Sequence, residues 1–425
     1  MVKIYLAYRL NFSSCMNFDL IYLQVLFSYM TKIKMYLYIC SLLTFLIGCK
    51  KDVQVAELQY PIYNDTIPHI KPFLSEIEPI DDIEFANSKN HLINFASKNW
   101  SEKNNVSFLV AKNGQIIYEN YQGFSNYENK SQITAETPIH IASVSKVITA
   151  TAIMILVDAG RILLDQKVNS ILQSFPYADV SVRDLLSHRS GIRNYAYFTE
   201  EKGVWNRKKI LKNIDILNLL GSKKIRQDCP ANRRFTYCNT NYAILALIVE
   251  KKVGTDFKTA IQKMIFEPLG MKNSFVFDEA NDKKNVSRSY KATNVEVGFD
   301  YLDAVYGDKN IYSTPRDLLR FDLARNSSGF LAPELRKQIY QAYSNEKKGT
   351  KNYGLGIRMI NFENGQNFYF HNGWWHGNTS SYISLQKEKV TIIALSNKYT
   401  TLNYRAKNLA KYFGNYPIVV KDSVE

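Results

Sequence analysis

Two Asn-Gly pairs near opposite ends of the chain constrain its fold more than any other sequence feature. Asn113-Gly114 and Asn364-Gly365 each separate two apolar runs, which is the strongest short signal of a β-hairpin. Two further apolar runs follow the second pair. The six predicted strands are residues 106–111, 116–121, 354–360, 366–371, 382–385 and 390–395. Strands are therefore expected at both ends of the chain.

Helical patterns occupy the stretch between these strands. Residues 143–159 carry an apolar face and stop at Gly160, a residue type that often ends helices. The other predicted helices are residues 182–187, 208–220, 241–252, 257–266, 315–324 and 404–412. Terminal strands around a helical middle predict an α/β (α+β) fold. One antiparallel sheet, flanked by helices and closed by both ends of the chain, would carry an inserted all-helical subdomain.

The first 48 residues have the pattern of an export signal. Lys32 and Lys34 precede an apolar run at 35–48, and Cys49 follows at once. This arrangement resembles a bacterial lipoprotein signal, in which Cys49 becomes the lipidated first residue. A transmembrane anchor is the alternative, but about 14 residues is short for a span. Residues 1–29 are interpreted as spurious upstream sequence, with Met30 or Met35 as the true start.

The rest of the chain is divided by composition. Residues 49–82 are polar and contain four prolines, so they are expected to form a flexible tether between membrane and domain. A single domain follows at 83–415, with a tail at 416–425. The expected location is the bacterial cell envelope, where a lipid anchor would hold the protein facing the periplasm or the outer surface. Cys229 and Cys238 could form a disulfide there or remain free thiols.

The net charge of +15 narrows the possible partners. Such a balance favours anionic surfaces such as a membrane or a cell-wall polymer, although a solvated lysine-rich surface explains it as well. The sequence has no arginine-rich helix, zinc-finger spacing or aromatic-basic RNA motif, so a nucleic-acid partner is not expected. The six histidines have no zinc-ligand spacing, and we expect neither a metal nor another cofactor.

Ser143 and Lys146 form the first candidate for chemistry. Positions three apart share one face of a helix, so the hydroxyl and the amine can meet. The first turn also offers free N–H groups to an oxyanion formed when Ser143 attacks a carbonyl. A lysine acts as base only if burial or a nearby cation destabilises its ammonium form. By itself the Ser-x-x-Lys spacing is weak, because a helix cap and a surface lysine explain it equally.

Two later motifs supply complementary groups. Tyr237-x-Asn239 places a phenol and an amide on one face of an extended stretch, where they can relay a proton and hold Lys146 or a substrate carbonyl. His371-Asn372-Gly373 ends a predicted strand. Gly373 would let substrate backbone approach closely, and the next N–H, that of Trp374, could be a second oxyanion donor. His371 would polarise the tyrosine or bind a carboxylate of the acyl side.

The order Ser-x-x-Lys, Tyr-x-Asn, His-x-Gly resembles the serine β-lactamase and penicillin-binding-protein family, in its class C, DD-peptidase and esterase branch. The resemblance covers residues 85–412. Further stretches similar to that family are LLSHRSGI at 185–192, NTNY at 239–242, IYSTPRDL at 311–318 and YGLG at 353–356. The Gly-x-Ser-x-Gly elbow of α/β-hydrolases is absent.

The resemblance implies a β-lactamase/transpeptidase-like fold with the active site in a cleft between the sheet and the helical part. Ser143 would attack an acyl carbonyl, Lys146 and Tyr237 would move protons, and water would release the acyl-enzyme. The substrate would be a small acyl compound or a peptidoglycan-type peptide, and the protein a monomer. The predicted function is a serine hydrolase acting on an amide or ester. A non-catalytic binding lipoprotein and a true class C-like β-lactamase are the alternatives.

Three departures from the family pattern affect specificity. His371 stands where many β-lactamases carry lysine, which puts lactam hydrolysis in doubt, and Asn372 would narrow the cleft. Residues 374–376, Trp-Trp-His, replace a usually small stretch and could form an aromatic wall. Residues 308–310, Asp-Lys-Asn, stand where glycines are usual, so this loop is expected to differ. His188 and His376 are interpreted as structural.

Overall fold

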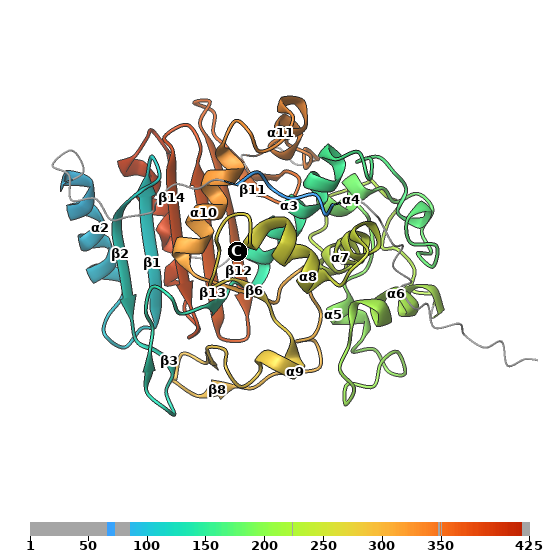
Figure 1. Ribbon diagram of the computed structural model, residues 1–425, viewed down its shortest axis with the longest axis horizontal. Helices are drawn as coiled ribbons and strands as arrows, with labels where there is room; N and C mark the ends of the chain where they lie inside the picture. Colours follow the sequence, from blue (N-terminus) through green and yellow to red (C-terminus); the bar gives the residue numbers. More distant parts are fainter. Residues whose placement is uncertain (1–65, 73–85, 223, 347–348, 350, 419–425) are drawn as a thin grey trace, which may run out of the picture. The chain divides into compact units, whose positions relative to one another are not determined.

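The computed structural model describes residues 66–72, 86–222, 224–346, 349 and 351–418. Its largest sheet has seven antiparallel strands in the order β10-β11-β12-β13-β14-β1-β2 (Figure 1). The strands are β1 (Val106–Lys112), β2 (Gln115–Gln122), β10 (Lys351–Tyr353), β11 (Arg358–Asn361), β12 (Asn367–Trp375), β13 (Asn378–Leu385) and β14 (Val390–Ser396). The N-terminal hairpin β1–β2 pairs with β14, which confirms the predicted closure of one sheet by both ends of the chain.

Both faces of this sheet are covered. In β1, Phe108 and Val110 pack in one apolar cluster with α2 (Ala86–Asn99) and η5 (Leu402–Tyr412). Alternate side chains of a strand point to opposite faces, and Leu109 and Ala111 accordingly join a second cluster with α3 (Ser145–Asp158) and α10 (Pro315–Asn326). All seven residues of β14 are buried. The neighbouring strand β13 is also buried along its whole length, so the centre of the sheet has no solvent-facing side.

The helical part lies beside the sheet (Figure 1). Its longer helices are α3, α6 (Asn213–Ser222) and α7 (Asn239–Val253). Helix α3 is buried from Ser145 to Leu156, and a helix that is apolar all round belongs inside a core. The shorter elements here and around the sheet are α4 (Val182–Leu186), α5 (Tyr195–Phe198), α8 (Phe257–Ile261), α9 (Glu279–Asp282), α11 (Pro333–Ile339), η2 (Ala142–Val144), η3 (Val168–Ser170) and η4 (Gln262–Phe266).

Three small sheets complete the described residues. A three-stranded sheet has the order β5-β9-β6, and two hairpins join β3 to β4 and β7 to β8. Their bounds are β3 (Phe124–Asn126), β4 (Ser131–Gln132), β5 (Ile139–His140), β6 (Phe275–Val276), β7 (Ser289–Tyr290), β8 (Glu296–Val297) and β9 (Ile311–Ser313).

Most predicted elements are present, with differences at their ends. Asn113 and Gly114 both have positive φ (52° and 84°), as the predicted tight turn requires. The predicted strand 354–360 is wrong at its start, because Gly354 turns back to bond Ile357 O before β11 begins. Strand β12 extends to Trp375, past the predicted end at 371. The predicted helix 208–220 begins only at Asn213, and 404–412 lies in the 3₁₀ helix η5.

Part of the predicted tether packs on the domain. Ile70 is buried and its N–H donates to Met264 O at 2.8 Å, so residues 66–72 are held by this contact. The predicted lipidation site, Cys49, and the signal lie outside the described residues. Cys229 and Cys238 are both free thiols. Within the part of the chain that the structure describes, no helix combines the length and the apolar character needed to cross a membrane.

Candidate active site

Ser143 sits in the short helix η2, directly before α3. The preceding residue, Ala142, has a φ of 48°, a conformation that residues other than glycine rarely adopt. Its N–H is held by the ring of His140, which accepts it at Nδ1 (3.1 Å). The turn that presents Ser143 is therefore strained and fixed by a buried neighbour, as is common at functional sites.

Lys146 meets Ser143 as the spacing predicts. Its Nζ lies 3.2 Å from Ser143 Oγ, within the reach needed for proton transfer, and the whole side chain is buried. The same Nζ donates to the backbone carbonyl of Asp308 at 2.7 Å. The lysine is thus fixed between the hydroxyl and a carbonyl on a distant loop.

Tyr237 lies beside this pair and between two cations. Lys146 Nζ is 5.1 Å from the centre of the Tyr237 ring, and the guanidinium of Arg358 is 4.8 Å from it. The ring of His188 packs against the phenol with centroids 4.3 Å apart. His188 Nδ1 accepts the N–H of Cys238 (3.1 Å), so the imidazole also holds the backbone next to Tyr237. This contact gives a physical basis for the structural role expected of His188.

Asn239 does not hold Lys146 in this structure. It begins helix α7, and its Oδ1 is buried without a hydrogen-bond partner among the described residues. Holding Lys146 was one of two roles expected of Asn239, and the backbone carbonyl of Asp308 fills that role instead. The other expectation, a contact with a substrate carbonyl, would use the amide nitrogen as donor and stays a prediction.

His371 is fully buried behind Tyr237. Its Nε2 lies 3.1 Å from the hydroxyl of Tyr353, and its Nδ1 lies 2.8 Å from Asn372 O. Burial, together with the positive charges of Arg358 and Lys146, lowers the pKa of His371 well below its usual range. The imidazole is therefore neutral at pH 7 and cannot bind a carboxylate by its own charge, one of the two roles expected of it. Polarisation of the tyrosine stays a prediction.

Gly373 brings strand β12 against the nucleophile. A Cβ at this position would lie 2.8 Å from Ser143 N, 2.6 Å from Ile141 O and 2.3 Å from Ser380 Oγ, closer than real Cβ contacts. In β12, strand β11 pairs with residues 367–370, so the end that carries Gly373 has β13 as its single strand partner among the described residues. Gly373 therefore packs closely against the Ser143 backbone. The expected approach of substrate backbone to Gly373 stays a prediction.

The two tryptophans after Gly373 diverge. Trp374 is 63% exposed and contacts Tyr399, whereas Trp375 donates its Nε1–H to Asp303 at 2.6 Å. Neighbouring residues of a strand point to opposite faces, so only Trp375 shares the face of Gly373. The predicted aromatic wall is therefore limited to Trp375 on that face. The backbone N–H of Trp374 stays a predicted oxyanion donor.

Sequence reasoning missed a buried charged group behind Lys146. The ammonium of Lys309 donates to the hydroxyl of Tyr195 (2.6 Å) and lies 4.6 Å from the centre of the Trp375 ring. The Tyr195 hydroxyl in turn donates to Asp308 Oδ2 at 2.9 Å. These contacts fix the loop whose carbonyl holds Lys146. The one sequence signal for this buried group was the replacement of the family's usual glycines at 308–310. Arg358 had no signal at all, because one arginine in a strand matches no motif.

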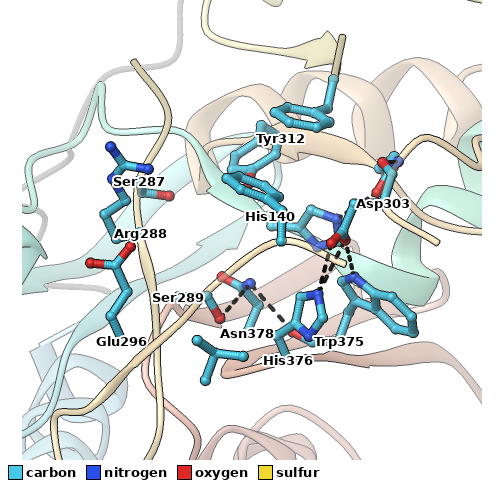
Figure 2. A pocket seen from close by; sticks show the side chains of 14 residues that line it. His140, Ser287, Arg288, Ser289, Glu296, Asp303, Tyr312, Trp375, His376 and Asn378 are labelled. Atoms are coloured by element: carbon cyan, nitrogen blue, oxygen red, sulfur yellow. Dashed lines mark hydrogen bonds and ion pairs between the residues drawn. The ribbon is translucent and has the colours of Figure 1, made fainter. Parts of the chain in front are cut away.

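A small cavity adjoins this group (Figure 2). His376 and Asp303 line it side by side, with His376 Nε2 3.0 Å from Asp303 Oδ2. Asp300 completes a group of three potential metal ligands whose ligand atoms lie within 4.8 Å of one another. The Asp303 oxygens already accept hydrogen bonds from Trp375, His376 and the backbone N–H of Asp300. The contact explains His376 as a structural residue.

Buried neutral histidines predict a pH effect on stability. Burial lowers the pKa of His140 to about 4, whereas in the unfolded chain it is near 6.5. Between pH 6.5 and about 4, His140 is protonated in the unfolded chain but not in the folded protein. The free energy of unfolding therefore decreases as the pH is lowered through this range. Between pH 6.5 and 5 the loss from His140 should be about 2 kcal/mol, at about 1.4 kcal/mol per pH unit.

Urea unfolding of the wild type and of His140→Gln at pH 7 and pH 5 tests this effect. The comparison is needed because burial raises the pKa of Glu250 to about 7 and that of Asp317 to about 6, and these carboxyls act in the opposite direction. We expect the wild type to lose about 2 kcal/mol more than the variant. Equal losses in the two proteins would contradict a neutral buried His140.

Comparison with known proteins places the chain in a family. The Beta-lactamase family model matches residues 100–413. Penicillin-binding protein 4* of Bacillus subtilis is 28% identical over 71% of this chain and 69% of its own length. The D-aminopeptidase of Brucella anthropi is 24% identical over 68% of this chain, and the match spans only 55% of that protein.

Solved structures agree on the fold. A penicillin-binding protein from Bacillus halodurans superposes with a TM-score of 0.65 at 21% identity, covering 76% of this chain and 99% of its own. The predicted fold class is thereby confirmed, and so is the predicted class of enzyme, a serine hydrolase related to β-lactamases and penicillin-binding proteins. The chain belongs to the Beta-lactamase family.

Proposed function

We propose that this protein is a cell-envelope serine hydrolase that cleaves an amide or ester bond of a D-amino-acid substrate through an acyl-enzyme on Ser143. The observation that carries the proposal is the 3.2 Å separation of Lys146 Nζ and Ser143 Oγ at the start of α3. A nucleophile within hydrogen-bond reach of a base is the arrangement that acyl transfer requires.

The reaction follows from these contacts. Lys146 takes the hydroxyl proton while Ser143 Oγ bonds to the acyl carbon, and backbone N–H groups of the first turn stabilise the oxyanion. Lys146 and Tyr237 then return a proton to the departing amine or alcohol. Water attacks the ester on Ser143 and gives up a proton to the same pair, which passes this proton to Ser143 Oγ as the acid leaves. Each residue thus regains its starting protonation state at the end of the cycle.

The substrate class rests on Arg358 and on the relatives. The Arg358 guanidinium lies against the Tyr237 ring, and no carboxylate of the described residues forms an ion pair with it. A substrate carboxylate, such as the free end of a D-amino-acid peptide, would supply the missing negative charge. Penicillin-binding proteins and a D-aminopeptidase among the relatives support such substrates. The anchor at Cys49 and a monomeric state stay predictions from the sequence.

A panel of matched substrates tests the reaction. The protein would be mixed with an N-acetyl-D-Ala-D-Ala peptide, its C-terminal amide, D-alanine and L-alanine methyl esters, and benzylpenicillin. We expect mass spectrometry to find the acyl group on the peptide that contains Ser143, and faster turnover of D than of L compounds. Acylation at another residue, or by no member of the panel, would refute the proposed function.

The role of Arg358 has its own prediction. Arg358→Gln should lower kcat/KM for the peptide with a free carboxylate about 10- to 100-fold, since a hydrogen bond between charged groups contributes roughly 1.5–3 kcal/mol. The amidated peptide should lose far less. The control is Arg207→Gln, which changes an exposed arginine. An equal loss on both peptides would mean that Arg358 supports the site without binding a carboxylate.

A further inference from the structure

A second cleft lies apart from Ser143, at the end of the sheet where β1 begins and β2 and β14 end. Figure 1 shows this end by the labels β3 and β8. The cleft has a volume of about 510 Å³ and is formed by residues 101–105, 123–124, 127, 292–294 and 398–400. This volume lies within the usual range of small-molecule sites. The catalytic residues described above do not line it.

Lys398 is a buried cation at this cleft. Its side chain is only 8% exposed, and its Nζ donates to the backbone carbonyl of Lys103 at 2.8 Å. Burial and the nearby Lys103 lower the pKa of Lys398. An ammonium group has three donors, and among the described residues only this carbonyl receives one. A buried charge without a counter-ion is costly, so the cleft is suited to an anion.

The other walls suit a hydroxyl-rich ligand. Tyr399 is 38% exposed, and Phe124 and Tyr127 line the cleft together with polar side chains of residues 293–294 and 101–105. Aromatic rings offer flat apolar surface, and amides and hydroxyls offer hydrogen bonds. Glu102 and Lys103 also line the cleft, and their opposite charges cancel. Lys398 therefore gives the cleft its net positive charge. The net charge of +15 also favours the approach of anions to the protein.

One residue of the cleft, Tyr399, contacts the strand that carries Gly373. Tyr399 contacts Trp374 with centroids 6.2 Å apart, and Trp374 directly follows Gly373 on β12. We propose that this cleft binds an acidic group, a carboxylate or a phosphate, carried by a sugar or polyol unit, with Lys398 as the cationic partner. Binding there requires no turnover at Ser143, so this proposal stands independently of the proposed function.

Three matched sugars test the proposal by isothermal titration calorimetry on the purified protein and on Ser143→Ala. Glucuronate carries a carboxylate, glucose 6-phosphate carries a phosphate, and glucose carries neither. We expect one or both acids to bind at least about tenfold more tightly than glucose, equally in both proteins. The better acid identifies the acidic group. Binding of neither acid, or binding no tighter than that of glucose, overturns the proposal.

Two variants locate the site. Lys398→Met keeps the hydrocarbon stem and removes the charge, and it should weaken binding of the acids about tenfold or more. Lys103→Met is the control, because it removes a rim charge and keeps the carbonyl, and it should change binding less than about threefold. If Lys398→Met does not fold, Tyr399→Ala replaces it with the same expectation. Unchanged binding in the folded variant would refute the assignment.

Discussion

Ser143→Ala is expected to lower hydrolysis of an activated ester by roughly 10⁴-fold or more, since loss of a catalytic nucleophile costs this much in other serine hydrolases. The variant should also lose labelling by a fluorophosphonate and by fluorescent penicillin. Lys146 is not expected to replace the nucleophile, because its Nζ is buried and is held, among the described residues, by hydrogen bonds to Ser143 Oγ and Asp308 O. Ester hydrolysis and gel fluorescence measure both effects.

Ser145→Ala is the matched control for this change. Ser145 lies two residues further along and its Oγ accepts the N–H of Ile311 (3.2 Å), so the substitution removes a buried hydroxyl without touching the reacting atoms. We expect this variant to be labelled like the wild type, with a stability loss of about 1 kcal/mol. Labelling that persists in Ser143→Ala would mean that the nucleophile is another residue.

Gly373→Ala should lower kcat/KM by about 10³-fold. The new methyl carbon would lie 2.6 Å from Ile141 O and 2.8 Å from Ser143 N, and backbone atoms cannot move aside as flexible side chains do. Strand β12 must then shift away from η2, which displaces Ser143 and the N–H groups near it. Loss of a single oxyanion donor already costs about 10²–10³ in rate, and here the nucleophile moves as well.

Gly298→Ala provides the steric control. A Cβ there would meet no atom within 4 Å, and this glycine has no positive φ. Ester kinetics and thermal unfolding of the two variants should differ sharply, with normal kinetics in Gly298→Ala. A fully active Gly373→Ala would contradict the close packing of β12 against the Ser143 turn.

The sequence predicted the framework because its signals are local. An Asn-Gly turn needs only two residues with positive φ, and Asn113 and Gly114 have them. Helix α3 was predicted from one apolar stretch, and the order of three motifs around Ser143, Tyr237 and His371 led to the family. The order of these motifs along the chain is typical of the family, so the family can be identified from the sequence without any interatomic distance.

The remaining features depend on contacts between distant segments. Arg358 contacts Tyr237 from strand β11, and Lys309 donates to Tyr195 on helix α5. Neither pairing leaves a periodic trace in the sequence. The neutral state of His371 could not be foreseen either, because it arises from complete burial and from the charges of two residues elsewhere. The holding of Lys146 by the Asp308 carbonyl involves a backbone atom, which every residue type supplies.

The pairing of β1 with β14 has a consequence for how the molecule is made. Ser107 opposes Leu395, so β1, an early strand of the domain, acquires this neighbour only when the last part of the chain has been synthesised. Contacts between such remote segments slow folding. A ribosome that stops short of β14 releases a chain in which β1 has β2 as its single strand partner and one flank of the sheet stays open. Ser143 is present in that product, yet the product cannot complete the sheet that supports it.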